Sequence, residues 1–342
     1  MAHNINTYIG RQAAWHTLGT VTGRYMTWEE IQNHGGLNFL PIKNRLELNG
    51  RPVDAWGITR SDNGVFLGPV GEGYEPIDHA KGFRMVDALL ESNNGAHYET
   101  AGALGQGETV WGLADLNLSL TVGRDDKSKM YLLFATSHNG SMSFAYWLTA
   151  TRVVCQNTLR MATKAGSQLR IKHTKNAHDR IADAHKALAT LSEETRTIES
   201  KLNFLAGRKM TRDSMISVMD RLFPKSKDEK GEAQDSTRRN NILADVLSRY
   251  ESNDGNAFPE QRGTAYNLLN AITEYTDHSR GSQSTKRAES AMFGTGERLK
   301  TQAVEVLMET ASGLPAMPVV QYVPSVPASA NLLDQIIATH HA

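Results

Sequence analysis

The clearest pattern in the chain is an alternation of apolar and polar residues over positions 109–122. A period of two over such a length is typical of a β-strand with one buried face. Apolar segments follow at residues 130–137 and 142–154, after the polar turns 123–129 and 138–141. Because connections this short join antiparallel neighbours, the pattern predicts an antiparallel β-meander.

A hairpin and a helix are expected before the meander. Asn49-Gly50 separates the strand-like residues 38–48 and 53–60. Asn-Gly supplies the positive φ angles that a two-residue hairpin turn needs. Residues 77–91 then place apolar side chains near helical spacing, which predicts a helix after the hairpin.

Helical periodicity dominates after the meander. Residues 157–164 predict a short helix, and residues 176–206 predict a long one. Its apolar positions recur at steps of three and four, with Thr195 filling one gap; they are Ile181, Ala184, Leu188, Leu191, Ile198, Leu202 and Leu205. Such a stripe packs against the protein's own sheet or, in a second interpretation, joins two subunits. Further helices are predicted at residues 210–223, 241–250, 264–275 and 295–310, with a charged loop at 225–239.

These elements predict an α+β fold, in which the antiparallel meander packs against the long helix and a mostly helical region follows. No proline lies between Pro76 and Pro224, whereas four of the ten prolines lie in the last thirty residues. Proline is excluded from helix interiors and central strands, so the final stretch should be an extended tail. The predicted organisation is an α+β core over residues 1–206, a helical region over 207–312 and a Pro-rich tail over 313–342.

Composition narrows the class of protein. The 342 residues include 39% hydrophobic residues and a single cysteine, Cys155. No run approaches the roughly 20 apolar residues that a membrane helix needs, and the first residues lack the pattern of a signal peptide. One cysteine allows no disulfide within the chain, which is typical of a reducing compartment. We therefore expect a cytoplasmic protein with no membrane partner.

Charge is distributed unevenly, although 37 Lys and Arg balance 37 Asp and Glu. Residues 152–186 hold eight basic and two acidic residues, and they follow a strand-like segment that carries aromatic side chains. Basic groups neutralise phosphates, and aromatic faces stack on unpaired bases. The segment therefore indicates nucleic-acid binding; a solvated helix face beside core aromatics explains it equally well. The candidate nucleic-acid-binding residues are Arg152, Arg160, Lys164, Arg170, Lys172, His173, Lys175 and Arg180, with Tyr146 and Trp147 near the bases.

Patterns for phosphate and metal binding are weak. The glycines of residues 68–73 and 102–107 do not match the phosphate-binding loop and indicate turns. A histidine-rich group (His173, His178, Asp179 and His185) follows the meander. His178 and His185 would lie two helical turns, or about 10 Å, apart, which is too far for one ion. We therefore predict no metal site and no cofactor.

Two residue pairs could support catalysis. Cys155 could act as a nucleophile beside His138, and Asp277 with His278 could serve a metal-dependent nuclease. A lone cysteine is more often a small buried apolar residue, and Asp277-His278 is explained by a helix C-terminal turn ahead of Arg280-Gly281. We therefore predict no catalytic residue.

Several motifs resemble those of a known family. They are Trp15-His16-x-Leu18-Gly19, TRVVCQNTL at residues 151–159, LNAITEYTDH at residues 269–278, and Phe293-Gly294 followed by Leu299-Lys300. The family consists of phage- and plasmid-encoded proteins catalogued as a domain of unknown function, number 932. The resemblance covers residues 8–310. It implies no activity, because the family has no established catalytic set.

The expected architecture also resembles the core of phage single-strand annealing proteins of the Red-beta, RecT and Sak groups. Those proteins form rings or helical filaments, hold single-stranded DNA in a basic groove between strand and helix, and pair complementary strands without ATP. The resemblance implies a homo-oligomer that binds and anneals single-stranded DNA in recombination. An alternative is a non-enzymatic interaction factor whose C-terminal tail, residues 313–342, docks a host or phage protein; a metal-dependent nuclease is a third option.

Overall fold

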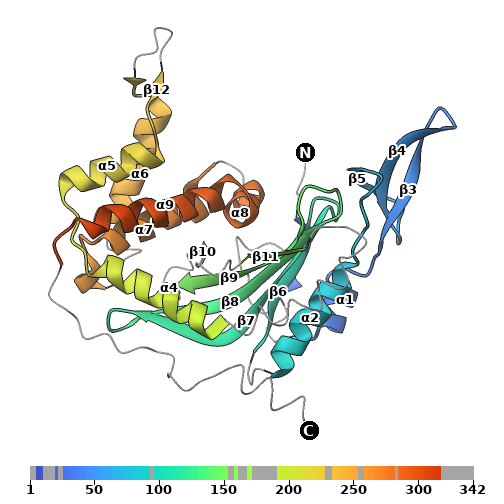
Figure 1. Cartoon of the computed structure of the whole chain (residues 1–342), viewed down its shortest axis with the longest axis horizontal. Helices are drawn as coiled ribbons and strands as arrows, with labels where there is room; N and C mark the ends of the chain where they lie inside the picture. Colours follow the sequence, from blue (N-terminus) through green and yellow to red (C-terminus); the bar gives the residue numbers. More distant parts are fainter. Residues whose placement is uncertain are drawn as a thin grey trace.

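The computed structural model of the chain describes residues 5–10, 20–21, 26–92, 96–152, 158–160, 168–171, 191–227, 233–252, 258–281 and 284–316. A long curved sheet lies at the centre, helices pack on it, and a small three-stranded sheet projects to one side (Figure 1). Within these residues, no helix combines the length and the apolar character that crossing a membrane requires. The observed class is α+β with a mostly helical C-terminal region, as predicted.

The main sheet has the strand order β10-β9-β8-β7-β6-β1-β2, and β11 also pairs with β9. Its strands are β1 (Ile5–Gly10), β2 (Thr20–Val21), β6 (His97–Leu104), β7 (Thr109–Val122), β8 (Asp126–Ser137), β9 (Phe144–Arg152), β10 (Thr158–Arg160) and β11 (Gln168–Ile171). The pairings between these strands are antiparallel except that of β1 with β2. The predicted meander is therefore confirmed as β7–β9, and β6 extends it.

Both faces of the meander are covered, whereas its alternation predicted one buried face. Val110, Ala114 and Leu132 belong to the larger apolar cluster on one face. Trp111 and Leu133 belong to a second, smaller cluster on the other face. This second face carries the polar positions of the alternation together with a large aromatic side chain. The alternation of apolar and polar residues alone did not predict that such a face would be buried.

One predicted element is wrong. Residues 158–160, expected in a short helix, form β10, which pairs antiparallel with residues 149–151 of β9. Strand formation depends on an available partner edge more than on local preference. Here the outer edge of β9 provides that partner. Residues 161–164 of the predicted helix lie outside the described residues.

The predicted hairpin is confirmed as β3 (Pro41–Leu48) and β4 (Arg51–Arg60). Asn49 and Gly50 have φ angles of 52° and 75°, as a tight two-residue turn requires. A further strand, β5 (Phe66–Val70), pairs with β4 and completes a separate three-stranded sheet.

The helices confirm most of the periodicity-based predictions. They are α1 (Trp28–His34), α2 (His79–Ser92), α4 (Leu191–Ala206), α5 (Arg212–Leu222), α6 (Thr237–Glu251), α7 (Ala265–Glu274), α8 (Ser284–Phe293) and α9 (Thr295–Ser312), with the short 3₁₀-helix η1 (Pro259–Gln261) and the π-helix η2 (Tyr275–Ser279), which continues α7. The segment predicted as a charged loop, residues 225–239, differs from a simple loop in that it holds the strand pair β12 (Ser226–Lys227) and β13 (Ala233–Gln234). It is also shorter than expected, because α6 begins within it. The side chain of Ser236 accepts a hydrogen bond from the Arg239 N–H and so starts α6 early.

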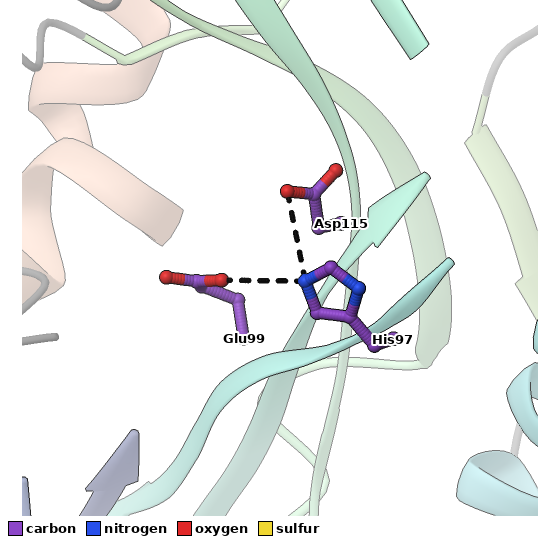
Figure 2. A group of neighbouring side chains, drawn as sticks. All are labelled: His97, Glu99 and Asp115. Atoms are coloured by element: carbon purple, nitrogen blue, oxygen red, sulfur yellow. Dashed lines mark ion pairs between the residues drawn. The ribbon is translucent and has the colours of Figure 1, made fainter. Parts of the chain in front are cut away.

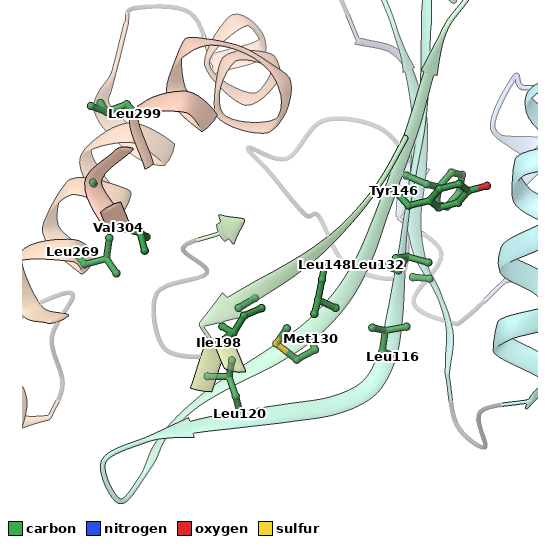
Figure 3. Packing of buried hydrophobic residues seen from close by; sticks show 14 of the residues in the cluster. Leu116, Leu120, Met130, Leu132, Tyr146, Leu148, Ile198, Leu269, Leu299 and Val304 are labelled. Carbon is green, nitrogen blue, oxygen red and sulfur yellow. The ribbon is translucent and has the colours of Figure 1, made fainter. Parts of the chain in front are cut away.

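The stripe of the predicted long helix packs on the protein's own sheet. Ile198, Leu202 and Leu205 on α4 are buried in the same cluster as Leu120 and Met130 of the sheet. Figure 3 labels Ile198, Leu120 and Met130 within this cluster. Polar side chains of α4 accept hydrogen bonds from the backbone at the end of β7. Glu199 accepts from the Thr121 N–H at 2.7 Å, and Asn203 accepts from the Gly123 N–H at 2.9 Å. The structure therefore supports the own-sheet interpretation for α4, and residues 176–190 lie outside the described residues.

Apolar residues of the sheet, α4, α7 and α9 form one continuous cluster. That cluster joins residues from the predicted core and from the predicted helical region. The division into residues 1–206, 207–312 and 313–342 stays a prediction.

Candidate functional site

The basic segment that the sequence singled out begins at one edge of the main sheet. β10 and β11 both pair with β9 on the side away from β8, so Arg160 lies opposite Thr149 and Arg170 opposite Ala145. Arg152 ends β9. Lys164, Lys172, His173, Lys175 and Arg180 lie outside the described residues. The structure thus brings three basic positions to the same edge of the sheet.

The two aromatic residues proposed to lie near bases are core side chains in this structure. Tyr146 is 2% exposed and donates a hydrogen bond from its hydroxyl to the Gly82 carbonyl. Burial raises the pKa of Tyr146 well above its ordinary value. Trp147 is 4% exposed and packs near Phe293, with the ring centroids 6.0 Å apart. The alternative interpretation of these residues as core aromatics therefore describes what is observed.

Trp147 also borders a cavity of about 590 Å³ between the sheet and the start of α9. Its wall includes Leu104, Met142 and Phe293 together with Glu289, Glu297 and Arg298. Acidic and basic groups both line this cavity, so its charge does not select an anionic ligand.

A second group of chemically competent residues lies on β6 and β7. His97 and Asp115 are directly paired across the two strands, and Glu99 is two positions further along β6. Figure 2 shows the three side chains converging, with one imidazole nitrogen between the two carboxylates. Their ligand atoms all lie within 4.8 Å of one another. Glu99 and Asp115 are buried, whereas the His97 side chain is 17% exposed. We call these three residues the His-Glu-Asp cluster.

Irregularities in both strands shape the His-Glu-Asp cluster. The register shifts beside Glu99 in β6 and again between Asp115 and Leu118 in β7. Bulges of this kind redirect side chains and occur often beside functional sites. Asn117 has a φ of 51°, and its N–H donates to Asp115 Oδ1 at 2.9 Å. The backbone therefore orients the Asp115 carboxylate.

A row of paired residues connects the cluster with the basic edge. His97 pairs with Asp115, Asp115 with Tyr131, Tyr131 with Thr149, and Thr149 with Arg160. The sequence analysis did not identify the cluster, because Asp115 lies on a different strand from His97 and Glu99. The available signal was His-x-Glu in a strand, a spacing that places both side chains on one face.

The histidine of the suggested Cys-His pair has a different neighbour in the described residues. His138 Nε2 lies 3.2 Å from His79 Nδ1, and His79 Nε2 lies 2.8 Å from the Leu37 carbonyl oxygen. A carbonyl only accepts, so His79 carries its proton on Nε2 and accepts from His138 through Nδ1. Cys155 lies outside the described residues.

Stability should fall on acidification because of His79. Burial, with a smaller contribution from the nearby Arg60 charge, lowers the pKa of His79 below 6.5, against the opposing effects of the Leu37 carbonyl and Asp78. Above pH 6.5 the imidazole is neutral in both states. Below it the unfolded chain binds a proton that the native state does not, so stability drops by up to about 1.4 kcal/mol per pH unit. Urea unfolding between pH 7.5 and 5 should show this slope in the wild type.

The variant His79→Gln tests the assignment, since glutamine can still donate to the Leu37 carbonyl but does not titrate. Its stability should depend less steeply on pH below 6.5. Identical slopes in both proteins would show that other groups cause the acid sensitivity.

The Asp277-His278 pair belongs to the end of a helix, as the structural interpretation predicted. Both residues lie in η2, which is followed by the extended Arg280 and by Gly281 with a φ of 78°. Lys300 of α9 donates a hydrogen bond to Asp277 Oδ1 at 2.6 Å, and both side chains are 2% exposed. Asp277 therefore forms a buried structural ion pair. His178, Asp179 and His185, the other suggested metal ligands, lie outside the described residues.

The fold and the site define an α+β protein with a broad antiparallel sheet, a basic edge and a His-Glu-Asp cluster. A family model for a domain of unknown function, DUF932, matches residues 66–294. The chain belongs to this family. No curated protein and no solved structure matches the chain.

Proposed function

We propose that this protein binds single-stranded DNA at the edge formed by β9, β10 and β11 and promotes strand annealing without ATP, in phage or plasmid recombination. One observation supports the proposal most directly. Three basic residues of the segment 152–186 that the structure describes, Arg152, Arg160 and Arg170, lie on strands that meet at one edge of the sheet, with Arg160 and Arg170 four pairing positions apart on β9. A row of cations along an edge suits an extended polyanion.

In this proposal, contacts to the phosphates of the DNA, rather than stacking on its bases, supply most of the binding free energy. Tyr146 and Trp147 are buried, so phosphate contacts by the basic side chains supply most of the affinity. Binding should therefore depend strongly on salt and little on base sequence. A homo-oligomer, as a ring or filament, would place several such edges along one strand.

The test is a salt series with fluorescent single-stranded and duplex oligonucleotides and the full chain. Arg170→Ala, Lys172→Ala and Lys175→Ala in one variant should weaken binding and reduce the slope of log K against log[salt] by about 2, since each phosphate contact to a single strand contributes about 0.7. A control variant changes three exposed arginines elsewhere, Arg51, Arg124 and Arg212, and should keep the wild-type slope.

Equal slopes for the two triple variants would reject the basic edge as the DNA site. Absence of DNA binding by the wild type at low salt would reject the function and favour the non-enzymatic interaction factor. In that case, deletion of the C-terminal tail, residues 313–342, should abolish binding of a host or phage partner.

A further inference from the structure

We propose that the His-Glu-Asp cluster binds a divalent transition-metal ion, with Mn²⁺ and Zn²⁺ as the best-matched ions. The cluster combines one imidazole and two carboxylates, His97, Glu99 and Asp115, with ligand atoms within 4.8 Å of one another. Imidazole favours transition metals, whereas carboxylates suit Mn²⁺ and also bind Zn²⁺. This site goes beyond the proposed DNA binding and does not depend on it.

The distances within the cluster suit a shared cation better than direct hydrogen bonds. His97 Nε2 lies 3.7 Å from Glu99 Oε2 and 3.8 Å from Asp115 Oδ2. A charged hydrogen bond would bring such atoms to about 2.7–2.9 Å. Ligands that lie about 2.0–2.2 Å from one ion are about 3.0–3.5 Å apart. The two distances from His97 Nε2 exceed this spacing by only a few tenths of an ångström, whereas ligand atoms of the cluster that lie up to 4.8 Å apart must approach by more than an ångström when an ion binds.

The protein already orients one of these ligands from behind. Asp115 Oδ1 accepts the Asn117 N–H, which leaves Oδ2 directed toward His97. Outer hydrogen bonds of this kind fix metal-binding carboxylates. All three ligands also lie on paired strands rather than on loops, so little conformational entropy is lost when an ion binds.

A buried hydroxyl beside the cluster points to a hydrated ion. Thr100 follows Glu99 and pairs with Leu113, two positions before Asp115 on the same face of β7. It is fully buried, and its Oγ1 has no hydrogen-bond partner within the described part of the chain. An unsatisfied buried hydroxyl is costly. A water that completes the coordination of a metal at the cluster would satisfy it.

Lys129 would compete with the metal ion for the carboxylate of Asp115. Its Nζ lies 3.3 Å from Asp115 Oδ2, and its side chain is 43% exposed. The ammonium group can therefore swing into solvent when a metal arrives. Solvent access to the site is provided at His97, whose side chain is partly exposed.

The experiment uses the full chain after treatment with EDTA. Mn²⁺ binding is followed by electron paramagnetic resonance, and Zn²⁺ binding by calorimetry. We expect one ion per chain at this site and a metal-dependent rise in the melting temperature, because the ion binds the folded state. The substitutions His97→Gln and Asp115→Asn should each weaken binding at least tenfold. His34→Gln with Asp54→Asn changes the same residue types at exposed positions and should leave the affinity unchanged.

A gain-of-affinity variant keeps the test decisive if a ligand variant fails to fold. Lys129→Met removes the competing charge at a partly exposed position and should tighten Mn²⁺ binding several-fold. Absence of stoichiometric binding at millimolar Mn²⁺ and Zn²⁺ would overturn the proposal. Unchanged affinity in His97→Gln and Asp115→Asn would overturn it as well.

The metal site and the DNA site can be separated experimentally. Asp115 and Arg160 are three strands apart in the paired row, or about 14 Å at about 4.8 Å per strand. The triple variant at Arg170, Lys172 and Lys175 should therefore bind Mn²⁺ with wild-type affinity. Metal binding without DNA binding would support this inference and reject the proposed function.

Discussion

The substitution Lys300→Met is expected to lower the free energy of unfolding by about 3–5 kcal/mol. Lys300 on α9 and Asp277 in η2 form an ion pair in which both side chains are 2% exposed. Removing one partner of a buried pair leaves the other charge without compensation in a medium that solvates it poorly. Methionine nearly matches the length of lysine, so the loss reports the charge rather than a cavity. Urea denaturation at pH 7.5 measures it.

Two comparisons isolate the buried charge. The double variant Asp277→Leu with Lys300→Met should recover much of the loss, because a buried pair replaced by apolar groups is often tolerated. Arg221 and Glu309 join α5 and α9 at the surface at 2.6 Å, with side chains 45% and 66% exposed. Arg221→Met should cost at most about 1 kcal/mol. Equal losses in Lys300→Met and Arg221→Met would contradict the role assigned to burial.

The substitution Gly82→Ala is expected to destabilise the protein by about 3 kcal/mol or more, although alanine is the better helix former by about 1 kcal/mol. Gly82 lies in α2, where the helix approaches β9, and an added Cβ would overlap the ring of Phe144. Phe144 is itself fully buried, so its ring has little room to move. Overpacking therefore outweighs the gain in helix propensity.

Thermal unfolding with a partner substitution tests this contact. In a Phe144→Leu background, where the side chain at this position is smaller, Gly82→Ala should cost much less than in the wild type. Gly71→Ala is the matched control, because nothing lies within 4 Å of its added Cβ. A loss from Gly82→Ala that persists undiminished in the Phe144→Leu background would assign the effect to α2 alone.

The local elements were largely predictable. Alternation identified β7, Asn49-Gly50 identified the β3–β4 hairpin, and spacing at three and four identified the stripe of α4. Each of these signals is a short-range property of the chain, set by the repeat of strands and helices or by a turn that needs positive φ angles. Such elements form wherever the global fold agrees with the local preference.

The sequence pattern did not predict the structure correctly where a contact with a residue far away in the sequence determines it. Residues 158–160 form a strand because the edge of β9 accepts them, which no local repeat encodes. The burial of Trp147 was not predictable either, because Trp147 packs near Phe293 of α8, a helix that the periodicity did not predict. Exposure depends on what covers a side chain, and the covering element is far away in the sequence.

The sequence by itself determined the α+β class, the meander, most helices and membership in the DUF932 family. Only the tertiary structure placed His97 and Glu99 of β6 beside Asp115 of β7, and Arg160 and Arg170 on the same edge of β9. The physical reason is that strand register, and not chain position, sets which side chains meet. Both proposed sites therefore depend on pairings between strands that periodicity alone does not specify.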